Sequence, residues 1–205
     1  MTPVPRFVLA SASPARLQTL RAAGVRAEVA VSGVDESQVG GPPAEVALTL
    51  AVRKAEAVAG SWPGTLVLGC DSVLELDGQA HGKPRDAAEA LARWQRMRGA
   101  SGVLHTGHCL IDTAAGRQRA ALASTVVHFG DLTDEEITAY VGTGEPLRVA
   151  GAFTVDGLGG AFVERIEGDY HTVVGLSLPL LRTLMAELGH RFTDLWQGST
   201  PDPGH

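Results

Sequence analysis

The sequence predicts an α/β fold in a single domain. Apolar, strand-like runs alternate along the chain with segments that carry helix start signals, which is typical of one α/β domain. The chain has 205 residues, of which 44% are hydrophobic and 20% are charged. This length and balance allow one compact core and argue against a disordered chain. No internal repeat and no linker interrupts the pattern.

The N-terminal third begins with a short strand that leads directly into a helix. Ser13 followed by Pro14 is typical of a helix N-cap and first turn, and a glycine at 24 suits the end of that helix. The expected elements are, in order, a strand at 6–10, a helix at 14–24, a strand at 27–31, an acidic loop at 34–37, and a helix that follows Pro42 and Pro43 and continues to about 59.

The middle and the end of the chain repeat this alternation. The run TLVLGC predicts a strand with Asp71 just past its end, and Asp77-Gly78 predicts a hairpin turn. Thr133 and Glu136 have the spacing of a capping box, which predicts a helix start. The other expected elements are a helix that Asp86 caps and that ends at Arg98, strands at 106–112, 124–129 and 162–166, and a helix at 178–188.

Composition excludes several classes of protein. No apolar stretch is long enough to cross a bilayer, and no signal peptide is apparent, so a cytoplasmic protein without a membrane partner is expected. The net charge of -6 argues against binding a nucleic acid polymer, although a cleft that gathers cations can still hold a small polyanion. Cys70 and Cys109 lack metal-ligand spacing and are expected to be buried free thiols.

The junction between the first strand and the first helix is a candidate phosphate site. A helix N-terminus offers unpaired N–H groups, to which Ser11, Ser13 and Arg16 would add donors. An ordinary helix cap with a surface arginine explains the same residues, and for this segment alone it is the simpler interpretation.

Asp71 is the second candidate, because ligands in open α/β sheets gather at the carboxyl ends of strands. A carboxylate there can hold Mg²⁺ or activate water, but it can equally be a turn aspartate. Glu36, Lys54 and Lys83 add charges that phosphoryl chemistry would use. Each of these three is individually better explained as a solvated surface charge, although glycine and proline restrain the backbone around Lys83.

Seven segments, taken in order, resemble the Maf family of nucleoside triphosphate pyrophosphatases. They are LASASPAR, VDES, LAVRKA, GCDSV, GKP, GEPLRVAGAF and IEGDYHTVVGLSL, which lie between about Phe7 and Arg182. The resemblance implies one elongated α/β domain over 1–197 with a mixed sheet flanked by helices, a deep central cleft, and often a homodimer. The Gly/Pro-rich tail at 198–205 is expected to be frayed.

The resemblance also implies roles for individual residues. Asp71 would be the general base or a metal-binding carboxylate, and Glu36 would help to bind a divalent metal, Mg or Mn. Ser11, Arg16, Lys54 and Lys83 would hold the triphosphate.

Three positions that bear on the nucleobase depart from the family's patterns. The branch that hydrolyses dTTP and UTP has arginine, threonine and glutamine at the positions of Ala15, Ser72 and Asp156. The branch that acts on 7-methyl-GTP has an acidic residue matching Asp156, but tryptophan and glutamine at the other two positions. The small Ala15 predicts a roomy base pocket and broad specificity.

The predicted function is metal-dependent hydrolysis of a nucleoside triphosphate to a monophosphate and pyrophosphate, which would clear non-standard or excess nucleotides. One alternative is a non-catalytic nucleotide-binding regulator linked to cell division. Another is a phosphatase that removes only the terminal phosphate. Pyrophosphate as the product would separate the first prediction from the last.

Overall fold

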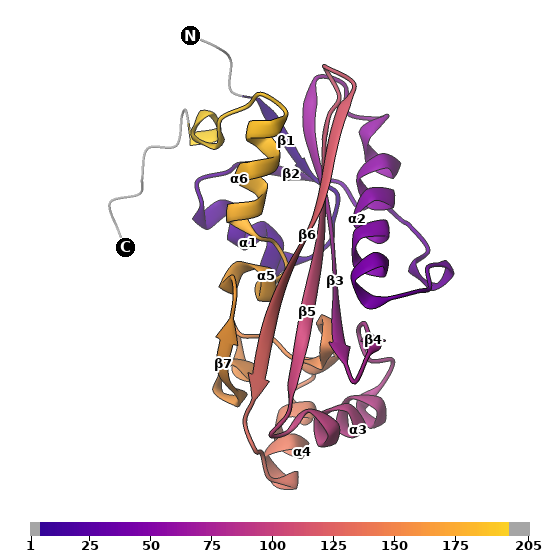
Figure 1. The fold of residues 1–205 in the computed structure, drawn as a ribbon, viewed down its shortest axis with the longest axis vertical. Helices are drawn as coiled ribbons and strands as arrows, with labels where there is room; N and C mark the ends of the chain where they lie inside the picture. The colour runs from indigo at the N-terminus through magenta and orange to yellow at the C-terminus, as the bar shows by residue number, and fades with distance from the viewer. Residues whose placement is uncertain (1–4, 197–205) are drawn as a thin grey trace.

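The computed structural model describes residues 5–196, which form an elongated α/β domain built on one mixed sheet (Figure 1). The strand order is β2-β1-β3-β5-β6-β7, and β4 pairs with β3 off this path. β1 (Arg6–Leu9) is parallel to β2 (Ala27–Val29) and to β3 (Thr65–Leu76), whereas the remaining pairings are antiparallel. The predicted α/β class with a mixed sheet is therefore confirmed.

The remaining elements follow the expected order. The strands are β4 (Gln79–His81), β5 (Ser101–Asp112), β6 (Arg117–Phe129) and β7 (Val163–Glu167). The helices are α1 (Pro14–Ala22), α2 (Pro43–Ala59), α3 (Ala87–Met97), α4 (Asp134–Gly142), α5 (Tyr170–Val174) and α6 (Leu178–Glu187). Short 3-10 turns are η1 (Glu36–Gln38), η2 (Pro146–Arg148), η3 (Ala150–Ala152), η4 (Leu158–Phe162) and η5 (Phe192–Trp196). The short helix α5 was not predicted, and β5 and β6 are longer than expected.

Local capping chemistry explains why the helix starts were predictable. The Ser13 side chain accepts a hydrogen bond from Arg16 N at the start of α1. At the start of α4 the Thr133 side chain accepts from Glu136 N, and the Glu136 carboxylate accepts from Thr133 N at 2.8 Å. The predicted capping box is therefore confirmed, and it satisfies two backbone donors that a helix start leaves unpaired.

Helices cover both faces of the sheet (Figure 1). α2 packs on one face, where two glycines allow its backbone to come unusually close. A Cβ atom at Gly69 would lie 2.7 Å from Ala55 N, and one at Gly107 would lie 2.7 Å from the Cα of Leu48. Real Cβ atoms do not tolerate such contacts, so these positions require glycine if the helix is to stay where it is.

The opposite face carries two separate apolar clusters. The first lies under α1 and α6 and includes Phe7, Leu20, Leu66, Leu68, Leu181 and Met185. The second gathers around Trp94 of α3 and Ile137 of α4 and includes Leu74, Leu76, Val127 and Phe153. On β3, Ser72 lies between the two clusters, and its hydroxyl is 2.9 Å from that of Thr106. Two hydrogen-bonded hydroxyl groups therefore lie on the sheet between the two apolar clusters.

β3 does not end before Asp71, as the sequence had indicated, but continues through it to Leu76. The apolar run stops at Cys70 because the next residues face a partly polar environment, not because the strand ends. On one edge of β3, pairing with β1 ends at Leu68, and pairing with β4 begins only at Leu74. Residues 69–73 thus have no strand partner on this edge. We call this stretch the open edge.

Other expectations concern burial and the ends of the chain. Cys70 and Cys109 are buried free thiols, as predicted. None of the helices in the described part of the chain is long and apolar enough to cross a membrane. The tail at 198–205 lies outside the described residues. The domain limits, the homodimer and the cytoplasmic location stay predictions.

A buried histidine ties α6 to the sheet. His108 on β5 is fully buried, and its Nε2 accepts a hydrogen bond of 2.8 Å from the backbone N of Ser177, the N-cap of α6. Its Nδ1 is 3.0 Å from the carbonyl of Thr106, which requires the neutral tautomer with hydrogen on Nδ1. Burial, with a smaller contribution from the positive Arg16, lowers the pKa of His108 to about 4.

We expect Gly107→Ala to lower the free energy of unfolding by about 1–3 kcal/mol, because the new methyl group would overlap the backbone of α2. Urea denaturation measures this loss. Gly60→Ala is the control, since Gly60 has a helical φ of -62° and no atom within 4 Å of a Cβ placed there. An unchanged midpoint for Gly107→Ala would contradict the close packing of α2 on β5.

The lowered pKa of His108 makes stability depend on pH. The unfolded chain binds a proton near pH 6.5, whereas the folded protein binds it only near pH 4, so stability is lost as the pH falls between these values. This should reduce the free energy of unfolding by about 2–3 kcal/mol between pH 7.5 and pH 4.5. His108→Gln should show a correspondingly shallower pH dependence in urea titrations. Parallel profiles for the two proteins would contradict the assignment.

Candidate active site

A cavity of about 860 Å³ lies against the open edge of β3. Its lining residues come from within 10–16, 31–36, 80–83, 143–158 and 173–175, together with residues of α2 and β3. All ten site residues proposed from the sequence line this main cavity: Ser11, Ser13, Ala15, Arg16, Glu36, Lys54, Asp71, Ser72, Lys83 and Asp156. The structure therefore gathers residues from six segments of the chain. The deep central cleft that the resemblance implies stays a prediction.

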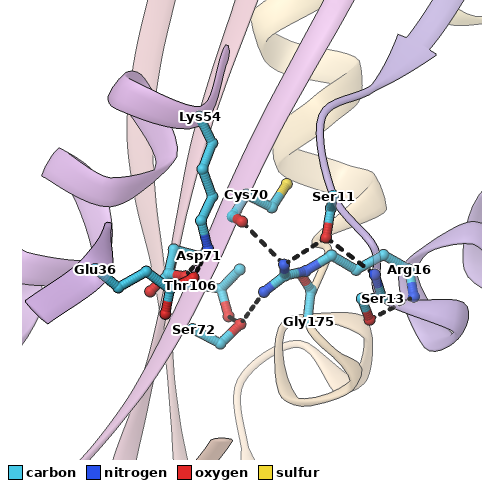
Figure 2. A network of polar contacts seen from close by, with 10 residues as sticks. All are labelled: Ser11, Ser13, Arg16, Glu36, Lys54, Cys70, Asp71, Ser72, Thr106 and Gly175. Carbon is cyan, nitrogen blue, oxygen red and sulfur yellow. Dashed lines mark hydrogen bonds and ion pairs between the residues drawn. The ribbon is translucent and has the colours of Figure 1, made fainter. Parts of the chain in front are cut away.

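Lys54 lies between two carboxylates (Figure 2). Its Nζ is 2.6 Å from Asp71 Oδ1 and 2.6 Å from Glu36 Oε1. Lys54 and Asp71 are buried, with 8% and 7% of their surface exposed, whereas the Glu36 side chain is 58% exposed. The helix α2 thus places the ammonium group of Lys54 against Asp71 on β3. The turn η1 places the exposed carboxylate of Glu36 next to the same ammonium group.

Burial raises the pKa of Asp71 above its ordinary value, although the positive charges of Lys54 and Arg16 oppose that shift. A raised pKa makes the carboxylate a stronger base than an exposed aspartate. The other oxygen of this group, Oδ2, accepts no hydrogen bond from any described residue, so it can face a water molecule or a metal ion. The side chain is therefore suited to removing a proton from water.

Arg16 points inward and binds the protein itself (Figure 2). Its Nε donates to Gly175 O at 2.7 Å, Nη1 donates to Ser11 Oγ at 3.0 Å and Cys70 O at 2.9 Å, and Nη2 donates to Ser72 Oγ at 3.0 Å. A guanidinium group has five N–H donors, so about one remains for a ligand. Arg16 is thus neither the surface arginine of the simpler interpretation nor a fully available phosphate ligand.

The serines of the first turn are also used within the protein. Ser11 Oγ accepts from Ser13 N as well as from Arg16, and Ser13 Oγ accepts from Arg16 N. Both hydroxyl groups can still donate their own hydrogen toward the main cavity, because their contacts are as acceptors. The predicted helix cap is confirmed, and it coexists with a position on the cavity wall.

The segment between η3 and η4 carries Asp156, whose Oδ1 accepts a hydrogen bond from the hydroxyl of Thr154. A nearby carboxylate, Glu145, holds this loop: it accepts from Leu158 N at 3.0 Å, Gly159 N at 2.9 Å and the Tyr140 hydroxyl at 2.8 Å. Asp156 and Ala15 also line a smaller hollow of about 260 Å³ outside the main cavity. These two residues therefore line both cavities.

Two cations of the main cavity are exposed. Lys83, which was predicted, follows Gly82, whose carbonyl accepts from Gly151 N and from Arg93 Nη1. Arg148 of η2 was not proposed from the sequence, although it lies in the matched segment GEPLRVAGAF. A surface arginine in a loop carries no local signal of function, so only its place on the cavity wall identifies it.

The residues present suit a divalent cation. Within 5–196 no group of three or more His, Cys, Asp or Glu side chains could hold a metal ion. Mg²⁺, however, needs only one or two protein carboxylates when substrate phosphates supply further oxygens. Asp71 and Glu36 could provide such a pair, since each has an oxygen that accepts no hydrogen bond from a described residue.

Comparisons with known proteins identify a family and several relatives. The family described as Maf-like protein matches residues 6–188. A Salinispora tropica protein named nucleoside triphosphate pyrophosphatase is 62% identical, with 97% of this chain and 92% of the relative covered. A Streptomyces coelicolor protein of the same name is 62% identical (96% and 98% covered), and one from Nostoc punctiforme is 52% identical (95% and 99%).

A solved structure, that of the Staphylococcus aureus Ham1 protein, is a distant likeness. Its sequence identity is 15% and its TM-score is 0.44, with 62% of this chain and 72% of that chain covered. A TM-score of 0.44 indicates only a distant similarity. The family match spans most of the chain, and relatives at 52–62% identity span nearly all of it. The chain therefore belongs to the Maf family.

Proposed function

We propose that this protein hydrolyses a nucleoside triphosphate to a nucleoside monophosphate and pyrophosphate. The observation that carries the proposal is a buried carboxylate, Asp71, held by Lys54 in a cavity that also presents unpaired cations. The names of the relatives support the same activity. A physiological role in clearing non-standard or excess nucleotides is part of the proposal.

Asp71 acts as the general base. Its Oδ2 takes a proton from a water molecule, whose oxygen forms a bond to the α-phosphorus of the substrate. The bond between the α-phosphorus and the oxygen that bridges to the β-phosphate then breaks, and pyrophosphate leaves with that oxygen. Lys54 keeps the carboxylate oriented through its 2.6 Å contact with Oδ1, which leaves Oδ2 as the acceptor.

A divalent cation, Mg or Mn, is proposed as the cofactor, with Asp71 and Glu36 as its protein ligands. Such an ion would neutralise phosphate charge and polarise the reacting phosphoryl group. The ammonium of Lys54 lies between the two carboxylates. Lys54 therefore balances their charge and keeps them close together.

Specificity for the base is assigned to Ala15, Ser72 and Asp156. Asp156 has one oxygen bonded by Thr154, and the other can accept a hydrogen bond from a base N–H group. Ala15 occupies little space next to it, so the pocket is proposed to admit several bases. Ser72 is already bonded to Arg16 and Thr106, and it contributes mainly to the shape of the pocket.

Asp71→Asn should reduce pyrophosphate release roughly 10²- to 10⁴-fold, because the amide cannot accept the proton from water. The assay measures pyrophosphate from canonical, methylated and deaminated triphosphates with Mg²⁺ or Mn²⁺, so it also ranks the bases. Asp77→Asn is the matched control, since Asp77 lies in the exposed hairpin turn after the same strand.

Three results would oppose the proposal. Full activity of Asp71→Asn would exclude Asp71 as the base. Orthophosphate as the only product would indicate removal of the terminal phosphate instead. No product from any triphosphate, with nucleotide binding retained, would favour a non-catalytic regulator.

Glu36→Gln should raise the metal concentration that gives half-maximal activity by at least roughly 10-fold, since even an outer-shell partner of a metal is worth that much. Titration of the EDTA-treated enzyme with Mg²⁺ measures the shift. Glu45→Gln is the control, because Glu45 is an exposed carboxylate near the start of α2 and does not line the main cavity. Identical Mg²⁺ curves for the wild type and Glu36→Gln would remove Glu36 from the metal site.

A further inference from the structure

Four cationic side chains line the main cavity, but they are not equally available to a substrate. Lys54 is paired with two carboxylates, and Arg16 uses four of its donors within the protein. Lys83 and Arg148 are exposed, and the side chain of neither makes a hydrogen bond or an ion pair with any residue between 5 and 196. The charge available for a polyanion is therefore concentrated in these two.

One backbone contact holds the two loops that carry these cations together. Gly151 N donates to Gly82 O at 3.1 Å, and Arg93 Nη1 donates to the same carbonyl at 2.6 Å. Lys83 immediately follows Gly82, and Arg148 precedes Gly151 by three residues. Two loops that are far apart in sequence are thus hydrogen-bonded into one support, which carries the unpaired side chains of Lys83 and Arg148.

That support is rigidly placed against the sheet. Gly151 has a φ of +71°, and a Cβ atom at this position would lie 2.8 Å from the Cβ of Leu74 on β3. Arg93, which reaches Gly82 from α3, is buried and is itself held by Glu89 at 2.7 Å. The backbone that carries Lys83 and Arg148 is therefore positioned before any ligand arrives, which lowers the cost of binding.

The cations that line the main cavity do not line the smaller hollow. Ala15 and Asp156 line both, and the described lining of the smaller hollow includes no lysine or arginine. Around Asp71 the charge of Lys54 is already balanced by two carboxylates. Beside the proposed divalent cation, the unpaired cations left to stabilise the negative charge that develops on a departing pyrophosphate are Lys83 and Arg148.

We infer that Arg148, together with Lys83, forms a subsite for the β- and γ-phosphates, and that Arg148 makes the enzyme prefer triphosphates to diphosphates. This inference rests on the proposed function. A guanidinium group can contact two phosphate oxygens at once, whereas an ammonium group acts as a point charge. Arg148 thus supplies directional recognition of the terminal phosphates, and Lys83 supplies charge.

The first measurement is the affinity for inorganic pyrophosphate with Mg²⁺, by titration calorimetry on the full chain. Arg148→Gln should weaken binding roughly 10- to 100-fold, the value of hydrogen bonds between charged groups. Arg148→Lys should bind with intermediate affinity. Arg182→Gln should be unchanged, because Arg182 is an exposed arginine of α6 that likewise has no partner among the described residues but lies outside the main cavity.

The second measurement compares kcat/KM for a nucleoside triphosphate and the matching diphosphate. Arg148→Gln should lower the triphosphate-to-diphosphate ratio, whereas a purely structural defect would reduce both values alike. An unchanged ratio, or pyrophosphate affinity equal to that of the wild type, would overturn the inference. If the wild type released no pyrophosphate from any triphosphate but bound pyrophosphate through Arg148, the subsite would stand and the proposed function would fail.

Discussion

The unpaired edge of β3 is the constraint on which the site depends. β1 pairs with this edge up to Leu68 and β4 pairs with it from Leu74, so the backbone between them faces the main cavity instead of another strand. A buried carbonyl without a donor would be costly there. Arg16 removes that cost for Cys70 O, and the same guanidinium joins α1 and Gly175 to the sheet. Closing the gap with a longer β1 would cover Asp71.

The charges of the site depend on close packing elsewhere. α2 can bring Lys54 to Asp71 only because Gly69 and Gly107 allow its backbone to approach the sheet. A buried carboxylate without a partner would be strongly disfavoured, and the ammonium compensates for it while leaving one oxygen unbonded. The loop that carries Asp156, the proposed contact to the base, is positioned in a similar way, since Glu145 accepts hydrogen bonds from its backbone. Packing and electrostatics therefore determine the site together.

Much of the fold was predictable from short-range signals. The starts of α1, α3 and α4 follow from caps whose donors and acceptors lie within three residues of each other. β3 beyond Cys70 was not predictable, because Asp71 and Ser72 interrupt the apolar run and read as a strand end. α5 was missed because five residues are too short for a periodic pattern; its Asp169 cap is itself tied to Thr125 of β6. Long-range pairing decided both cases.

The sequence by itself determined the order of the elements, the family and the ten candidate residues, because these reside in local patterns and in matched segments. It could not reveal which of those residues use their hydrogen-bonding groups within the protein and which keep them available for a ligand. Only the tertiary structure decided that Arg16 uses most of its donors within the protein and that Lys54 is shared by two carboxylates. It also decided that the side chains of Lys83 and Arg148 remain available. The physical reason is that a side chain's availability depends mostly on partners far away in the chain: apart from Ser11, the partners of Arg16 and Lys54 are between 17 and 159 residues distant.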